Sequence, residues 1–87
     1  MKTAFLETIR KRSVELIQIT DVHITEDTQV PFCLLVVYDI NHSQVRLFER
    51  IDTKKGRHMY DTLKKALIET SHSYVSINTI TETIELY

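Results

Sequence analysis

The chain has 87 residues and a mass of 10.2 kDa, the size of one small domain. Charged residues make up 26% of it and hydrophobic residues 43%, proportions that exclude a disordered tail or a low-complexity segment. Eleven Lys and Arg against twelve Asp and Glu leave a net charge of -1, so no overall field attracts nucleic acid or an anionic membrane. We therefore expect one folded domain over residues 1–87. A domain of this length buries only a small hydrophobic core, which favours association with a second copy or a partner.

The N-terminal segment has an ambiguous pattern. Its apolar residues, together with Leu16 and Ile17, fall on one face of a helix. We predict a short helix from Lys2 to about Arg12, followed by a strand within residues 13–25. Along residues 13–25 the apolar residues move from even to odd positions and back again, which indicates either a bulge or a helical start. The pattern leaves residues 13–18 open, because the helix could continue to Gln18.

Two adjacent strands follow in the middle of the chain. Apolar residues alternate over Val30–Ile40 and again over Gln44–Asp52, and Asn41–Ser43 has the composition of a turn. Both faces of the first of these strands are apolar, since Cys33, Leu35 and Val37 face away from its even-numbered residues. We therefore predict a hairpin whose first strand is buried on both sides.

The strongest periodic signal predicts an amphipathic helix from about Arg57 to Ser71. Its apolar face is Met59, Tyr60, Leu63, Ala66, Leu67 and Thr70. The remaining residues, Tyr74–Tyr87, alternate with a change of parity near Asn78 and Thr79, which predicts one bent strand. The predicted fold is α+β, a mostly antiparallel four-stranded sheet with two helices in the order α-β-β-β-α-β.

The doubly apolar central strand needs a cover on each face. The helix over residues 57–71 can cover one face. The face with Cys33, Leu35 and Val37 then requires either the N-terminal helix, through Phe5 and neighbouring apolar residues, or the surface of a partner.

Residues that could carry chemistry are sparse. Gly56 is the only glycine, so no phosphate-binding or nucleophile motif is present. The four histidines lack the spacing of metal ligands, and Cys33, between apolar neighbours, is expected to be buried and unreactive. We therefore predict a protein that is not an enzyme and needs no cofactor or metal. A single cysteine and the lack of a long apolar stretch predict a cytoplasmic location and no membrane partner.

Charges alternate in blocks along the chain, and we expect the blocks to neutralise one another within the fold or between subunits. One pattern indicates more. Arg46, Phe48 and Arg50 share a strand face that continues into basic residues at the start of the second helix, where free N–H groups attract anions. The basic residues of this candidate nucleic-acid surface are Arg46, Arg50, Lys54, Lys55 and Arg57.

From these features we predict a protein-binding module that regulates or inhibits a protein partner, of the kind mobile elements and phages encode, and that forms a homodimer. The predicted partner-binding residues are Arg46, Phe48, Arg50, Leu35 and Val37. Nucleic-acid binding through the basic residues above is the alternative. The sequence does not identify the partner.

Overall fold

A computed structural model of the chain, which describes residues 3–69 and 74–87, contains six strands and one helix over those residues. In chain order they are β1 (Ala4–Arg10), β2 (Ser13–Glu26), β3 (Phe32–Asp39), β4 (Gln44–Asp52), α1 (Thr53–Ile68), β5 (Tyr74–Asn78) and β6 (Thr83–Leu86). None of the described helices is long and apolar enough to cross a membrane.

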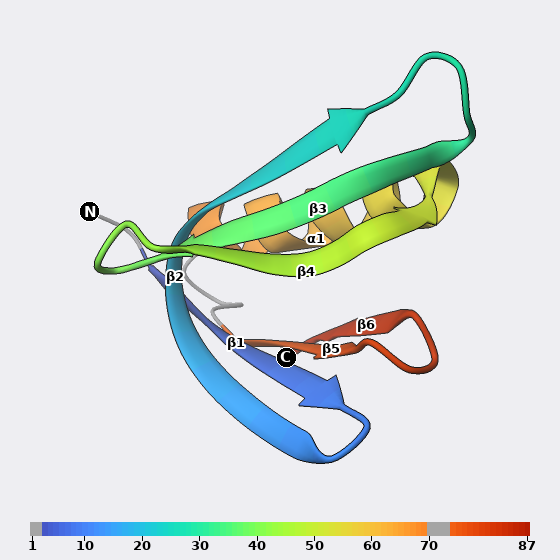
Figure 1. The fold of residues 1–87 in the computed structure, drawn as a ribbon. Helices are drawn as coiled ribbons and strands as arrows, with labels where there is room; N and C mark the ends of the chain where they lie inside the picture. The colour runs from blue at the N-terminus through green and yellow to red at the C-terminus, as the bar shows by residue number, and fades with distance from the viewer. Residues whose placement is uncertain (1–2, 70–73) are drawn as a thin grey trace.

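All six strands form one curved sheet in the order β4-β3-β2-β1-β5-β6 (Figure 1). Neighbouring strands are antiparallel except β1 and β5, which are parallel. The α+β class is confirmed, but the predicted four-stranded sheet with two helices is wrong. The parallel pair arises because α1 carries the chain from β4 across the sheet, so that β5 enters beside β1 in the same direction.

The predicted N-terminal helix is replaced by β1, and the open segment 13–18 belongs to β2. A turn at Lys11 and Arg12 joins the two strands as a hairpin. Alternation decides the faces of β1, since Ala4 and Leu6 are fully buried while Phe5 on the other face is exposed. β1 pairs with β2 on one side and β5 on the other. These long-range pairings outweigh the weak helical preference of a short segment.

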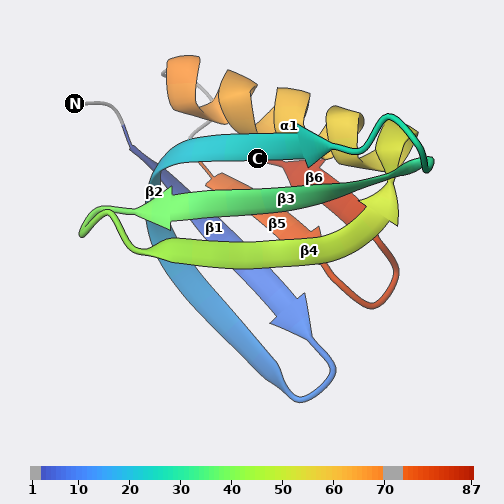
Figure 2. The ribbon, with the colours of Figure 1, turned by 45° about the horizontal axis from the view of Figure 1, so that its top comes forward.

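The change of parity in β2 corresponds to a bulge. The register shifts between Ile19 and Asp21, and β2 bends there, so that its first half pairs with β1 and its second half with β3. The Val22 N–H donates to the Asp21 carboxylate at 2.8 Å, which satisfies a donor at the irregularity. The bend divides the sheet into two wings, visible in the two views (Figures 1 and 2).

The C-terminal segment forms two strands instead of one bent strand. The Asn78 side-chain oxygen accepts hydrogen bonds from the N–H groups of Ile80 and Thr81 at 2.9 and 3.1 Å. This asparagine turn reverses the chain, and Glu82 takes a left-handed conformation with φ 54° before β6 begins. The predicted parity change at residues 78–79 therefore marks a hairpin.

The amphipathic helix is confirmed, with an earlier start. Asp52 caps α1 by accepting from the N–H groups of Lys54 and Lys55, so the helix begins at Thr53 and not near Arg57. It ends at Ile68, and the expected last residues 70–71 lie outside the described part of the chain. Four residues of the predicted apolar face are buried, namely Met59, Leu63, Ala66 and Leu67. Gly56, about one turn before Met59, is buried on the same face.

α1 packs on the concave face of the sheet and covers Cys33, Leu35 and Val37. This cover therefore comes from the second predicted helix, and not from an N-terminal helix. The close fit depends on Gly56, because a Cβ at this position would lie 2.2 Å from Cys33 Sγ. The largest fully buried side chains are Leu6, Ile19, Leu35, Ile51, Met59, Leu63, Ile77, Val22, Val37, Val75 and Thr8.

Candidate functional site

The residues predicted to share one face of β4 are separated by the local geometry of that strand. Its register against β3 shifts twice between Ile51 and Arg46, so the simple alternation is interrupted. Phe48 is half-buried and packs against the hydrophobic core. Arg46 and Arg50 are exposed, and the Arg50 guanidinium lies 4.4 Å from the centre of the Phe32 ring. Only the two arginines of the predicted set are therefore available on the surface.

The other two predicted partner-binding residues lie in the core. Leu35 and Val37 are both 0% exposed beneath α1. Neither side chain can reach a partner while the fold is intact. The apolar surface that the sequence left without a cover is part of the hydrophobic core.

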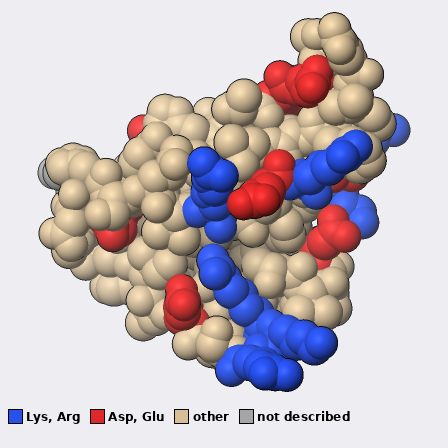
Figure 3. Space-filling view, viewed as in Figure 1, with Lys and Arg blue, Asp and Glu red and all other residues tan. Residues whose placement is uncertain are grey.

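Two of the predicted basic residues, Arg57 and Arg46, already interact with carboxylates, whereas the ion pairs found within residues 3–69 and 74–87 include none of Arg50, Lys54 and Lys55. The Asp52 side chain occupies the N–H groups that would attract an anion. Arg57 forms a bidentate ion pair with Glu26, which lowers the pKa of Glu26 and raises that of Arg57. Arg46 lies 3.7 Å from Glu49. In the space-filling view, blue and red groups are interspersed over this wing of the sheet (Figure 3).

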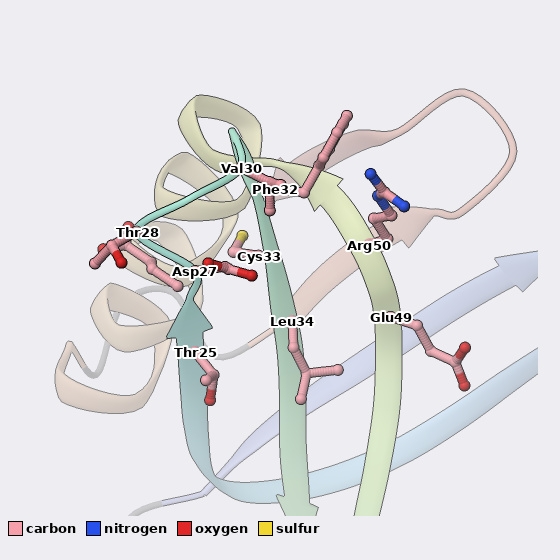
Figure 4. A pocket seen from close by; sticks show the side chains of 10 residues that line it. Thr25, Asp27, Thr28, Val30, Phe32, Cys33, Leu34, Glu49 and Arg50 are labelled. Carbon is pink, nitrogen blue, oxygen red and sulfur yellow. The ribbon is translucent and has the colours of Figure 1, made fainter.

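An open hollow of about 670 Å³ lies where β2 and β4 end and β3 begins (Figure 4). Its lining residues are Thr25, Glu26, Asp27, Thr28, Val30, Phe32, Cys33, Leu34, Glu49 and Arg50. Burial raises the pKa of the Cys33 thiol, and the charges of Glu26 and Asp52 raise it further. A buried thiol with a raised pKa forms less of the nucleophilic thiolate, which disfavours Cys33 as a reactive group of this hollow.

The first half of β2 presents a different surface. β3 pairs with β2 only from Ile19 onward, so on that side Ser13–Ile17 has no neighbouring strand among the residues that the structure describes. The C=O of Gln18 accepts from the Ile40 N–H at 3.2 Å, so its backbone points away from β1. Because direction alternates along a strand, the N–H and C=O groups of Val14 and Leu16 point the same way, toward solvent. We call residues 13–17 the open β2 edge.

Exposed apolar side chains accompany these free backbone groups. Val14 and Leu16 are each 62% exposed, and their side chains lie on the convex face, opposite α1. On β1, which runs alongside, Ile9 pairs with Val14, and Phe5 on the same face is 43% exposed. Val14 and Leu16, with Ile9 and Phe5 on β1, therefore form an apolar strip along the open β2 edge, which Glu7 interrupts on β1 opposite Leu16.

The two outer edges of the sheet differ from the open β2 edge. β4 carries charged, exposed Arg46, Glu49 and Arg50 and has two register shifts, features that oppose pairing with another strand. β6 is only four residues long and exposes Glu85. The open β2 edge has one charged residue, Glu15, no proline and no register shift. It is the edge best suited to accept a further strand.

Comparisons with protein-family models, curated proteins and solved structures find no match to this chain. Within residues 3–69 and 74–87, no group of three or more His, Cys, Asp or Glu side chains is placed to hold a metal ion.

The sequence contains a signal for the strand that forms the open β2 edge. Val14 and Leu16 are two apolar residues at alternate positions directly after a basic turn, the pattern of a strand with one apolar face. The predicted helix over residues 2–12 leaves this strand without β1, the neighbour whose pairing defines the apolar face of Val14 and Leu16. The absence of a strand on the other side could not be inferred, because it depends on where β3 ends.

Proposed function

We propose that this protein is a non-enzymatic protein-binding module that holds its partner by accepting an extended segment at the open β2 edge. The observation that supports the proposal is the coincidence of free backbone groups and exposed apolar side chains at Val14 and Leu16. An added strand would pair with the backbone groups, and its side chains would cover part of the apolar strip.

This mode of binding fits a regulator or inhibitor, which acts by occupying a surface of its partner. Nucleic-acid binding through β4 and the helix start is less favoured, because Arg46 and Arg57 each face a carboxylate and the first N–H groups of α1 face Asp52. The lone, buried Cys33 is compatible with a reducing compartment, and we propose the cytoplasm.

Val14→Pro is a sharp test, because proline removes an N–H that points to solvent and leaves the pairing with β1 intact. Val14→Thr is the matched control, since it keeps the N–H and nearly the same shape. Tagged protein would be used to capture proteins from the host lysate, with quantitative mass spectrometry as the readout. Circular dichroism would check that each variant is folded.

We expect at least one protein to be retained by the wild type and by Val14→Thr and to be lost with Val14→Pro. If folded Val14→Pro retains every protein that the wild type retains, binding does not use the open β2 edge and the proposal is wrong.

A further inference from the structure

A cluster of positive charge borders the open β2 edge. Arg10, Lys11 and Arg12 are consecutive, exposed, and lie at the tip of the β1–β2 hairpin, immediately before Ser13. The ion pairs found within residues 3–69 and 74–87 involve other cations, so no carboxylate of the described chain neutralises this tip within 4.0 Å. Figure 3 shows blue side chains gathered where the hairpin tip lies in Figure 1.

We propose, on the basis of the function proposed above, that the open β2 edge binds an extended acidic segment of a protein partner. Apolar side chains of that segment lie beside Val14 and Leu16, and its acidic residues follow at its C-terminal end, next to the hairpin tip. The charge of the tip and the apolar strip together select this class of ligand.

The direction follows from the sheet. β2 runs from the hairpin tip toward the body of the protein, and an antiparallel strand, the slightly more stable pairing, would run toward the tip. At the other end, β3 and the Ile40 N–H already occupy the side of β2 beyond Ile17. The segment can therefore pair over about five residues, roughly 17 Å, before its C-terminal continuation reaches Arg12.

A second copy of this chain fits the edge less well. Two copies related by a two-fold axis pair residues of the same parity. The register that sets Val14 against Leu16 also sets Glu15 against Glu15 of the other copy, which is destabilising. The register that centres on Val14 sets Arg12 against Leu16 of the other copy, so the tip has no acidic partner. An acidic segment has neither defect.

The test uses the full-length protein and fluorescein-labelled synthetic peptides, with fluorescence polarisation as the readout. In the first peptide, valine alternates with threonine and three glutamates follow at the C-terminal end. The second has the glutamates at the N-terminal end, and the third has lysines in their place. We expect the first to bind most tightly, the third least, and added salt to weaken the first.

Two sets of variants separate the tip from general charge effects. Reversal of the tip with Arg10→Glu, Lys11→Glu and Arg12→Glu should weaken the first peptide about tenfold, since each exposed ion pair contributes a factor of roughly 1.5 to 5. The matched control, Lys54→Glu with Lys55→Glu, makes a similar change at two exposed cations on α1 and should leave the affinity unchanged. Val14→Pro should abolish binding of every peptide.

Four results would overturn the inference. If all three peptides bind with equal affinity and Val14→Pro binds none of them, strand addition at the open β2 edge stands, but selection for acidic segments is excluded. A native mass spectrum with a wild-type dimer and a monomeric Val14→Pro variant would assign the edge to a second copy. Direct binding of labelled single-stranded DNA that depends on the tip cations but is unaffected by Val14→Pro would assign the tip to nucleic acid. If no peptide binds, the inference fails, and the capture experiment with Val14→Pro still decides the proposed function independently.

Discussion

The contact between Gly56 and Cys33 sets how closely α1 approaches the sheet, and it can be tested by substitution. A Cβ at Gly56 would lie 2.2 Å from Cys33 Sγ and 3.2 Å from Ile51 Cγ2. Gly56→Ala therefore forces either the sulfur or the helix to move. Overpacking of a core typically costs about 1–3 kcal/mol, and alanine regains about 1 kcal/mol of helix propensity. Because 2.2 Å is far inside van der Waals contact, we expect a net loss of about 2 kcal/mol.

Cys33→Ala provides the second arm of a double-mutant cycle. Removal of this buried sulfur alone should cost about 1–2 kcal/mol, from lost burial and the cavity that remains. In the double variant the new methyl group at position 56 can occupy the vacated space. The two losses should therefore be less than additive, with a coupling of about 2 kcal/mol.

Urea unfolding followed by far-UV circular dichroism is a suitable assay, because the chain contains no tryptophan. A loss of about 2 kcal/mol corresponds to a fall in Tm of roughly 8–16 °C for a domain of this size. A Gly56→Ala variant as stable as the wild type would refute the close-approach argument. If the losses of stability in the two single variants are strictly additive in the double variant, Cys33 Sγ is not the atom that limits the approach of α1 to the sheet.

Three further substitutions test the packing and the electrostatics of the fold. Asp52→Ala removes the N-cap of α1 and should lower the free energy of unfolding by about 1 kcal/mol in urea titrations, whereas Asp52→Asn should retain most of the stability. The Thr8 hydroxyl is buried without a hydrogen-bond partner among the described residues, so Thr8→Val should raise stability by about 1 kcal/mol; a destabilised variant would indicate that this hydroxyl is satisfied. Arg57 lowers the pKa of Glu26 below its ordinary value of 4.5, so the stability that this carboxylate contributes is present above pH 4.5 and is lost as the pH falls through the lowered pKa. The urea midpoints of the wild type and Glu26→Gln should therefore differ at neutral pH and converge in acid, and a difference independent of pH would contradict this assignment.

Local patterns in the sequence determined several elements of the fold. The strand over Gln44–Asp52 and the turn before it were predicted correctly, because alternation and turn-forming residues act over a few positions. The helix was predicted for the same reason, although its start was placed too late. Asp52 both ends the alternating stretch Gln44–Asp52 and caps α1, so the strand pattern alone does not show where the helix begins.

Pairing between distant segments determined the rest, which only the tertiary structure could show. Residues 4–10 can satisfy a weak helical pattern or alternate as a strand, and their partners β2 and β5 select the strand. The burial of Leu35 and Val37 depends on which side of the sheet α1 covers. The open β2 edge exists because β3 ends before it reaches Ser13–Ile17. An unpaired edge is a property of the whole sheet, so no short stretch of sequence encodes it.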